Sequence, residues 1–544
     1  MTLEFSTQKY IFIFLSLSIN ILLSLALYFY DNFWFLYILI LTPSSVLTIL
    51  RILFIIIFSI YEYFTKQKYD KIENKNIVYA IPCYNESFDE LYNNINAFVT
   101  QKNADDNKKL LVIVCDGKVT GRGNEKSTDK ILTEDIFNEN IDNRQYITNA
   151  YTTWNDEYNN SEVCTGTYKG LPFVLVIKEN NVGKRDSIAL IRKNLFKFNQ
   201  STLNNILEYE TLDNVLFEVY DMLGFGTFDC IIGTDGDTIL DNDCVFHLIT
   251  ELYNEKDINV IGLSGFIKIA KDMNFSSPWV FHQQVSYIRG QIVARLHQSK
   301  VTKKVNCLPG CVQIIKIQTE TCGLKVMDEY NRLPSKDESL PRNLRAHVGE
   351  DRMHICTAMY MYPYIKTKQS LSAFAYTAVP DSWTVYLSQR RRWSLGSNSN
   401  QVKLVTSSKI HWYERLSSFF SILSWLLTLF INFALINLVI LFTKLNYFNF
   451  QSDLIWATFI SVIVIVTVPN VYLLTCPLWM KMSKKEYMYL IIGVLTWYII
   501  SLPLNLISYF YTIFNLDNFT WGKTRECVAT VAAVEDSLDG KDQV

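Results

Sequence analysis

Long apolar runs at both ends of the chain limit what it can fold into more strongly than any other feature. The runs cover about 10–30, 33–63, 417–443, 454–475 and 487–514. A helix needs roughly 20 apolar residues to cross a bilayer. Residues 75–400, between these runs, have the mixed composition of a soluble domain. The sequence therefore predicts an integral membrane protein with a globular middle.

Charges beside the first two runs predict the orientation. Lys66, Lys68 and Lys71 follow the second run, and no comparable basic cluster separates the two runs. The positive-inside rule then places the N-terminus and the middle domain in the cytosol. A signal peptide is not expected, because a second apolar run follows the first at once. The net charge of −2 gives no reason to expect nucleic-acid binding.

The cysteines give little sign of a metal site or a disulfide framework. The chain has 11 of them at irregular spacing, without any CxxC pair. Cys307 and Cys311 have the nearest approach to a metal-binding or disulfide spacing. Reduced thiols in a cytosolic domain are the favoured interpretation.

Short apolar runs in the middle domain predict a parallel sheet. Five runs rich in β-branched residues read as buried strands: 77–83, 110–116, 172–178, 229–235 and 260–266. Helical stretches between them indicate mostly parallel strands, whose ligands bind beyond the carboxyl ends. Residues 135–170 are rich in Asn, Thr and Tyr, and we interpret them as an insertion or long loop.

The C-terminal part raises a question of topology. A short amphipathic piece, 409–416, precedes the last three runs, and a polar tail that we expect to be flexible follows residue 526. Lys481, Lys484 and Lys485 indicate that the final run starts at the cytosolic side. Pro503 lies inside this run. We expect a bend near it, which makes the run a re-entrant or partly interfacial element.

Two acidic residues at a strand end are candidates for metal binding. Asp235 ends the predicted strand 229–235, and Asp237 follows two residues later. Two carboxylates at this spacing suit a divalent cation and, through it, a diphosphate. A solvated acidic turn would have the same pattern.

Two later motifs combine charged and aromatic residues. In the first, Glu350 and Asp351 precede Arg352; a carboxylate beside a cation can stay ionised and act as a base, although a surface salt bridge would look alike. The second is QRRRW, 389–393. Guanidinium groups suit phosphate oxygens and an indole face suits a sugar ring, but a membrane-proximal helix has a similar composition.

Three further segments end a strand or begin a helix with polar residues. They are IPCYNES (81–87), VCDG (114–117) and GKRDS (183–187), the last of which offers Lys184 and Arg185. Each could alone be a solvated loop. All these motifs occur together and in order in one α/β domain flanked by membrane spans. A shared function is therefore the better interpretation.

This ordered set resembles the processive family-2 glycosyltransferases, which include cellulose, hyaluronan and chitin synthases. The exact residues of six motifs are similar to those of chitin synthases. These motifs are GNEKST (123–128), GKRDS (183–187), CLPGC (307–311), GEDR (349–352), QRRRW (389–393) and TWGKTR (520–525). The resemblance covers about residues 77–526. GLSGFIK (262–268), FHQQVSYI (281–288) and Lys523 depart from the usual spelling.

The resemblance implies an α/β glycosyltransferase domain, GT-A-like with a mostly parallel sheet, inserted between transmembrane helices. The implied divisions are a membrane segment at 1–70, a cytosolic glycosyltransferase domain at 75–400, an interfacial helix with transmembrane segments at 405–526, and a flexible tail at 527–544. It also implies a location in the plasma membrane, reached directly or through intracellular vesicles. Whether the chain forms a homo-oligomer is left open.

The implied reaction is an inverting, processive transfer of N-acetylglucosamine from UDP-N-acetylglucosamine. The acceptor is the non-reducing end of a growing β-1,4-linked chitin chain, which then crosses the membrane, and the cofactor is Mg²⁺ or Mn²⁺. A hyaluronan- or cellulose-type synthase is the nearest rival. A catalytically inactive scaffold is disfavoured because every motif position is filled, and a transporter would leave the middle domain unexplained.

The resemblance also implies roles for donor-side residues. The uridine would be held by Pro82, Tyr84, Glu86 and Asp116. Lys184 would support the nucleotide. Asp235 would lie by the ribose or the metal, and Asp237 would ligate the metal.

On the acceptor side, the resemblance implies that Asp351 is the general base. Gln389 and Trp393 would line the acceptor tunnel, and Arg392 would pair with the diphosphate. A segment that closes over the donor would carry Trp521 and Arg525.

Overall fold

The computed structural model of the protein describes residues 4–29, 42–65, 69–121, 123–203, 207–270, 273, 275, 277–335, 338–445 and 467–519. The chain forms two compact units. Unit 1 comprises Met1–Lys71, His247–Pro309 and Asp328–Gly522, and unit 2 comprises Ile72–Phe246, Gly310–Met327 and Lys523–Val544. The middle of the chain therefore contributes to both units.

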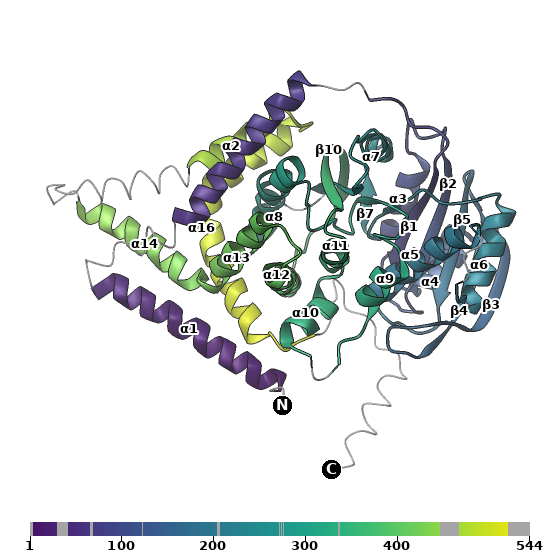
Figure 1. Ribbon diagram of the computed structural model, residues 1–544, viewed down its shortest axis with the longest axis horizontal. Coiled ribbons are helices and arrows are strands. Elements are labelled where there is room, and N and C mark those ends of the chain that lie inside the picture. Colours follow the sequence, from purple (N-terminus) through teal and green to yellow (C-terminus); the bar gives the residue numbers. More distant parts are fainter. Residues whose placement is uncertain are drawn as a thin grey trace, which may run out of the picture. The chain divides into compact units, whose positions relative to one another are not determined.

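Unit 2 is built on a mixed sheet (Figure 1). Its strands run in the order β3 (Ile141–Thr152), β4 (Tyr158–Tyr168), β5 (Leu171–Lys178), β2 (Lys108–Cys115), β1 (Asn76–Cys83), β6 (Cys230–Gly233) and β9 (Gln313–Lys316). The central pairs β5–β2, β2–β1 and β1–β6 are parallel. The predicted strands of this unit are confirmed, and their near-continuous apolar runs fit a parallel sheet covered on both faces.

The helices of unit 2 are α3 (Phe88–Val99), α4 (Thr128–Lys130), the π-helix η3 (Ile131–Ile136), the short 3₁₀ turn η4 (Asn138–Asn140), α5 (Lys184–Ser201) and α6 (Thr211–Met222). The longer ones, α3, α5 and α6, bury apolar side chains. A capping box starts α3, in which the Ser87 N–H donates to the Glu90 carboxylate at 2.8 Å. Leu195 and Phe198 of α5 and Leu216 of α6 are buried in the main hydrophobic core.

The interpretation of residues 135–170 as a long loop is wrong. β3 and β4 form an antiparallel hairpin, and β4 also pairs with β5, so the hairpin extends the sheet. Most of β3 is exposed. Its polar composition therefore reflects a strand with a solvated face, and Thr and Tyr favour strands at such positions.

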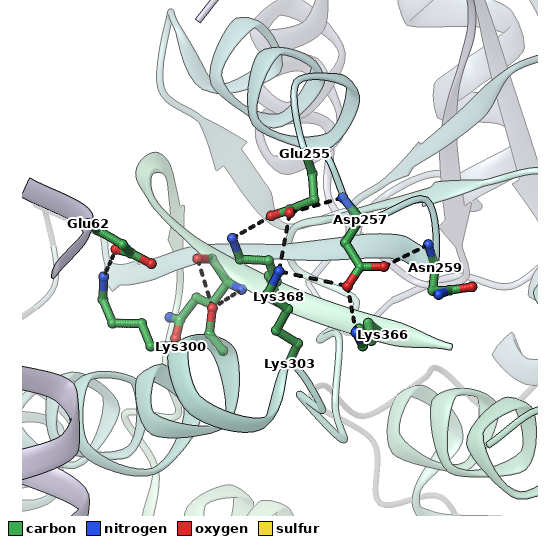
Figure 2. A network of polar contacts seen from close by, with 10 residues as sticks. Glu62, Glu255, Asp257, Asn259, Lys300, Lys303, Lys366 and Lys368 are labelled. Atoms are coloured by element: carbon green, nitrogen blue, oxygen red, sulfur yellow. Dashed lines mark hydrogen bonds and ion pairs between the residues drawn. The ribbon is translucent and has the colours of Figure 1, made fainter. Parts of the chain in front are cut away.

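Unit 1 contains the parallel pair β8 (Val260–Ile269) and β10 (Lys366–Thr377), which confirms the fifth predicted strand. Figure 2 shows the polar network beside this pair. Lys366 pairs with Asp257 at 2.5 Å, and Lys368 pairs with Glu255 at 2.7 Å. Lys300 pairs with Glu62 near the end of an apolar helix. This last pair joins the end of a predicted membrane helix to the segment around Lys300.

The other elements of unit 1 are helical. Among the described residues they are α1 (Phe5–Phe29), α2 (Thr42–Phe64), α8 (Pro278–Arg289), η5 (Gly290–Arg295), η6 (Gln298–Thr302), α10 (Leu340–Val348), α11 (Glu350–Met361), α12 (Trp383–Thr406), α13 (Trp412–Leu426), α14 (Thr428–Leu445), η7 (Cys476–Leu478) and α16 (Lys484–Phe514). Two helices are divided between the units along the chain: α7 (Cys244–Tyr253) at Phe246 and α9 (Leu324–Asn331) at Met327. The short strand β7 (Thr238–Leu240) belongs to unit 2. The predicted α/β fold with a mostly parallel sheet, set in the chain between apolar helices, is confirmed.

Within the described residues, two helices are long and apolar enough to cross a membrane, or up to four if each bent pair is one span. The two bends are both of 70°. One separates α13 from α14. The other divides α16 into Lys484–Trp497 and Ile499–Phe514. Pro503 cannot donate to the carbonyl of Ile499, and its ring crowds that group. The predicted bend is present, whereas its placement as a re-entrant element stays a prediction.

Candidate functional site

The predicted donor-side residues of unit 2 follow the carboxyl ends of neighbouring parallel strands. Cys83 of β1 is level with Cys115 of β2, and Ala80 of β1 is level with Gly233 of β6. Tyr84, Glu86, Asp116 and Asp235 come directly after these ends. The expectation that the motifs meet at one edge of the sheet is therefore confirmed for this unit.

Asp235 contacts two groups, a lysine ammonium and a cysteine thiol. Its carboxylate forms an ion pair with the ammonium of Lys184, the first residue of α5. The other oxygen lies 3.3 Å from the Sγ of Cys311. Burial raises the pKa of the Cys311 thiol well above its usual range, and the Asp235 charge raises it further, so the thiol donates. The cysteines in the described part of the chain are all free.

Glu86 packs against the turn between Asp235 and Asp237. Its carboxylate accepts the N–H groups of Tyr84 at 2.6 Å and Asn85 at 3.0 Å. A Cβ added at Gly236 would lie 2.9 Å from a Glu86 oxygen, so a side chain there would require the Glu86 carboxylate to shift. Burial raises the pKa of Glu86. Burial also raises the pKa of Asp237 to about 7, and the negative charges of Asp235 and Glu86 contribute to this increase. The turn is thus short of positive charge.

A divalent cation fits this turn only together with a ligand. Among the residues that the structure describes, no three His, Cys, Asp or Glu side chains form a metal cage. Mg²⁺ commonly uses one or two carboxylates and takes its other oxygens from phosphates and water. Asp237, with Asp235 beside it, supplies such a carboxylate pair. The donor set therefore suits a cation that binds with a diphosphate.

Asp116 is fully engaged by the protein. Its buried carboxylate pairs with Lys178 at 2.6 Å and accepts the N–H groups of Val182 at 3.0 Å and Gly183 at 2.8 Å. Gly183 has a φ of +112°, which favours glycine. Asp116 thus fixes the loop that leads into Lys184. Its contact with a uridine stays a prediction.

Lys178 is a functional neighbour that sequence reasoning missed. Its side chain is fully buried and also pairs with Asp186 at 3.0 Å. Burial lowers the pKa of Lys178, but the two carboxylates outweigh this effect and raise it overall. The only signal in the sequence was a lysine that closes an apolar strand, and an exposed strand end would look the same.

In unit 1, two glycines bring the GEDR and QRRRW motifs together. Asp351 is the second residue of α11, and Gln389–Trp393 lie within α12. Cβ atoms built on Gly349 and Gly396 show a backbone contact without room for side chains, since the Gly349 Cβ would lie 2.9 Å from the Gly396 Cα. Asp351 therefore stands two residues from the point at which α12 touches the chain. Figure 1 labels the helices concerned, α10, α11 and α12.

The first cysteine of CLPGC lies beside the GEDR motif. Arg352 donates to the side-chain oxygen of Asn306 at 2.8 Å. Burial raises the pKa of Cys307, while Arg352 lowers it and Asp351 raises it, so these side chains are neighbours. Cys307 thus lies beside the GEDR motif in unit 1, and Cys311 lies beside Asp235 in unit 2.

The QRRRW residues divide between a buried and an exposed face of α12. Gln389, Arg391 and Arg392 are buried, whereas Trp393 is 44% exposed. The Arg390 guanidinium lies 4.9 Å from the Trp393 ring centre, and the Tyr287 ring centre lies 5.7 Å from it. Trp393 therefore presents an aromatic surface supported from behind. The predicted Trp521 and Arg525 lie outside the described residues.

Comparison with known proteins decides the family. Residues 52–542 match the family model described as chitin synthase. The chain belongs to the chitin synthase family. It is 32% identical to chitin synthase 8 of Gibberella zeae over 470 residues, which cover 86% of this chain and 69% of that protein. It is 31% identical to chitin synthase 8 of Verticillium dahliae, with 70% and 65% covered.

More distant relatives agree with this assignment. Chitin synthase 4 of Cryptococcus neoformans var. grubii is 26% identical over 480 residues, which cover 84% of this chain and 36% of that protein. Among solved structures, the mannosyltransferase PcManGT of Pyrobaculum calidifontis in complex with GDP-Man and Mn²⁺ is 13% identical, with 83% of this chain and 96% of that chain covered and a TM-score of 0.38. The predicted family and the prediction of a transferase are confirmed by the family match.

Proposed function

We propose that this chitin synthase family member transfers N-acetylglucosamine from UDP-N-acetylglucosamine to a growing β-1,4-linked chitin chain, processively and with inversion. The observation that carries the proposal is the meeting of Glu86, Lys184, Asp235 and Asp237 at one turn beyond the sheet of unit 2. This turn combines a lysine ammonium with a carboxylate pair. A nucleotide diphosphate needs both kinds of group.

On the donor side, Lys184 is the group that moves. In the ligand-free protein its ammonium neutralises Asp235. A diphosphate offers more negative charge at the same place, so the ammonium would turn to the phosphoryl oxygens. Pro82 and Tyr84 would contact the uridine, and Asp116 would act by holding the loop before Lys184.

Asp237, with Asp235, would hold Mg²⁺ or Mn²⁺ there. When bound, the ion would supply neutralisation of the charge that grows on the departing UDP. Asp237 favours this role because burial and its acidic neighbours raise its pKa to about 7. A cation would remove that repulsion and keep the carboxylate ionised.

On the acceptor side, Asp351 would be the general base. The acceptor O4 attacks the anomeric carbon, the bond from that carbon to the phosphate oxygen breaks, and the O4 proton passes to the Asp351 carboxylate. UDP leaves with the bonding electrons. The positive end of α11 favours a negative side chain at this position before the transfer.

Trp393 and Gln389 would bind the acceptor sugar, and Arg392 would pair with the diphosphate. The exposed face of Trp393 suits the apolar face of a sugar ring. Trp521 and Arg525 would close over the donor. The apolar helices α1 and α2 and the two bent pairs would pass the polymer across the plasma membrane, with the catalytic part in the cytosol.

The test uses the purified full-length chain in detergent or liposomes. We expect it to make an insoluble polymer from UDP-N-acetylglucosamine alone, and we expect chitinase to degrade that polymer. UDP-glucose and UDP-glucuronate serve as parallel donors. A polymer that needs either of them, or one that resists chitinase, would overturn the proposal in favour of a cellulose- or hyaluronan-type product.

A further inference from the structure

A small pocket in unit 2 holds polar groups that the proposed mechanism does not use. It lies between α5 and the strands β1, β6 and β9, and Pro82, Lys184 and Asp235 form part of its wall. Its volume is about 30 Å³. This is the room of roughly two water-sized groups. The pocket can therefore accept a few oxygen atoms beside the donor-side residues, but no nucleoside.

Arg192 is the first of these groups. It lies two turns after Lys184 on the same side of α5 and lines the pocket, and its side chain is only 6% exposed. Within the described part of the chain, no ion pair or hydrogen bond of Arg192 is found. The neighbouring Cys322 provides no counter-charge, because burial raises the pKa of its thiol even though Arg192 lowers it.

Gln313, at the start of β9, is the second group. It is 4% exposed, lines the same pocket and lies level with Gly233 of β6. Its side-chain amide also has no hydrogen-bond partner among the residues that the structure describes. Two buried polar side chains from different elements thus share one pocket without satisfying each other.

Burying a guanidinium without a counter-charge costs free energy. Proteins keep such groups where a ligand supplies the missing charge, at the expense of stability. The planar guanidinium offers several N–H donors that match phosphoryl oxygens, and the Gln313 amide adds another donor. Lys184, on the same wall, adds a second positive charge. These groups together fit an anionic oxygen cluster better than a neutral ligand.

We propose that Arg192 and Gln313, with Lys184, form a phosphoryl subsite for the diphosphate of the donor and of the UDP product. The inference rests on the proposed function, because it assumes that the pocket wall faces a nucleotide diphosphate. Arg192 is then a binding residue in its own right. When Lys184 leaves Asp235 for the diphosphate, Arg192 holds the same group from deeper in the pocket.

The experiment compares the full-length protein with Arg192→Met and, as a matched control, Lys193→Met. Lys193 is the next residue of α5 and does not line the pocket. We would measure thermal unfolding without ligand and the Kd for UDP and for uridine in the presence of Mg²⁺. Uridine is the neutral probe, since it lacks the phosphoryl groups.

We expect Arg192→Met to weaken UDP binding by 10-fold or more and to leave uridine binding unchanged. Without ligand, its unfolding midpoint should stay the same or rise, because an uncompensated buried charge has been removed. Lys193→Met should bind UDP normally. A lower midpoint together with an unchanged Kd for UDP would instead assign Arg192 a structural role and overturn the subsite.

Other outcomes separate this inference from the proposed function. If the unmodified protein binds GDP rather than UDP, the proposed donor is wrong, while loss of GDP binding in Arg192→Met would still support the subsite. If UDP binding is normal in both variants, the pocket holds only water and the subsite is wrong. Should Arg192→Met fail to fold, Gln313→Leu takes its place, with a smaller loss of UDP affinity expected.

Discussion

Replacing Gly396 by alanine tests whether the contact between α12 and the start of α11 sets the catalytic geometry. A Cβ at Gly396 would lie 2.6 Å from the carbonyl oxygen of Val348 and 2.9 Å from the Cα of Gly349. Both are backbone atoms, so no flexible side chain can move aside. The helix that carries Gln389, Arg392 and Trp393 must then separate from the segment that carries Asp351.

The size of this movement follows from the contact itself. Ordinary van der Waals contacts of a Cβ begin at 3.4 Å. The difference between 3.4 and 2.6 Å, about 0.8 Å, is the movement that would restore an ordinary contact. A misplacement of about 1 Å can cost ~10²-fold in rate. Overpacking costs about 1–3 kcal/mol of stability, of which alanine in a helix returns roughly 0.5–1 kcal/mol.

We therefore expect Gly396→Ala to stay folded, with a modestly lower unfolding midpoint, and to lose between 10-fold and ~10²-fold in chitin synthesis. UDP binding should fall less than synthesis, because Glu86, Lys184 and Asp237 belong to unit 2, whereas Arg392, which would pair with the diphosphate, lies on α12. Gly290→Ala is the matched control. A Cβ at that helical glycine meets nothing within 4 Å. Full synthesis by a folded Gly396→Ala variant would refute the idea that this contact sets the geometry.

Four further substitutions test the other assignments. Asp351→Asn should lose ~10²-fold or more in turnover and keep UDP affinity, because the amide cannot take a proton; near-normal turnover would exclude Asp351 as the base. Asp237→Ala should abolish synthesis and weaken UDP binding that depends on a divalent ion; equally tight binding by the unmodified protein in EDTA would contradict the metal role. Trp393→Ala should reduce polymer formation more than hydrolysis of the donor, and equal losses would point to a structural role. Lys178→Met leaves two buried carboxylates uncompensated and should cost about 3–5 kcal/mol in denaturant unfolding; Lys75→Met, which breaks a partly exposed pair, should cost at most about 1 kcal/mol.

The sheet was predictable because its strands are buried on both faces. Such strands read as short apolar runs, and their carboxyl ends share an edge wherever they are parallel. The runs that became β1, β2 and β6 therefore placed Glu86, Asp116 and Asp235 correctly. The hairpin β3–β4 was missed for the complementary reason, since an exposed strand lacks the apolar run by which a buried one is found.

The partners of the site residues were not predictable. The sequence offers Asp116 as a free carboxylate at a strand end, but its partners Lys178 and Gly183 lie more than sixty positions further along the chain. The contact of Gly349 with Gly396 is equally invisible, because a glycine in a motif gives no sign of what approaches it. Residue types and order thus point to the reaction, whereas positioning depends on long-range packing.

Hydropathy alone does not give the number of membrane crossings, because polar side chains such as Asn20 can stabilise a bend within an apolar segment. Asn20 interrupts the apolar run of α1 and is only 2% exposed. Its amide donates to the carbonyl of Leu426 at 2.8 Å and accepts the N–H of Phe430 at 2.8 Å. These are backbone groups on either side of the 70° break between α13 and α14.

A break in a helix within hydrocarbon exposes peptide groups, each at a cost of several kcal/mol unless a partner is found. Ser16 adds to the repair, since its hydroxyl lies 2.7 Å from that of Tyr509, which in turn donates to Leu426. The polar side chains on one side of α1 thus satisfy the peptide groups exposed at the bend between α13 and α14. Hydropathy counts that segment as a straight span, because the groups that permit the bend lie about 400 positions away.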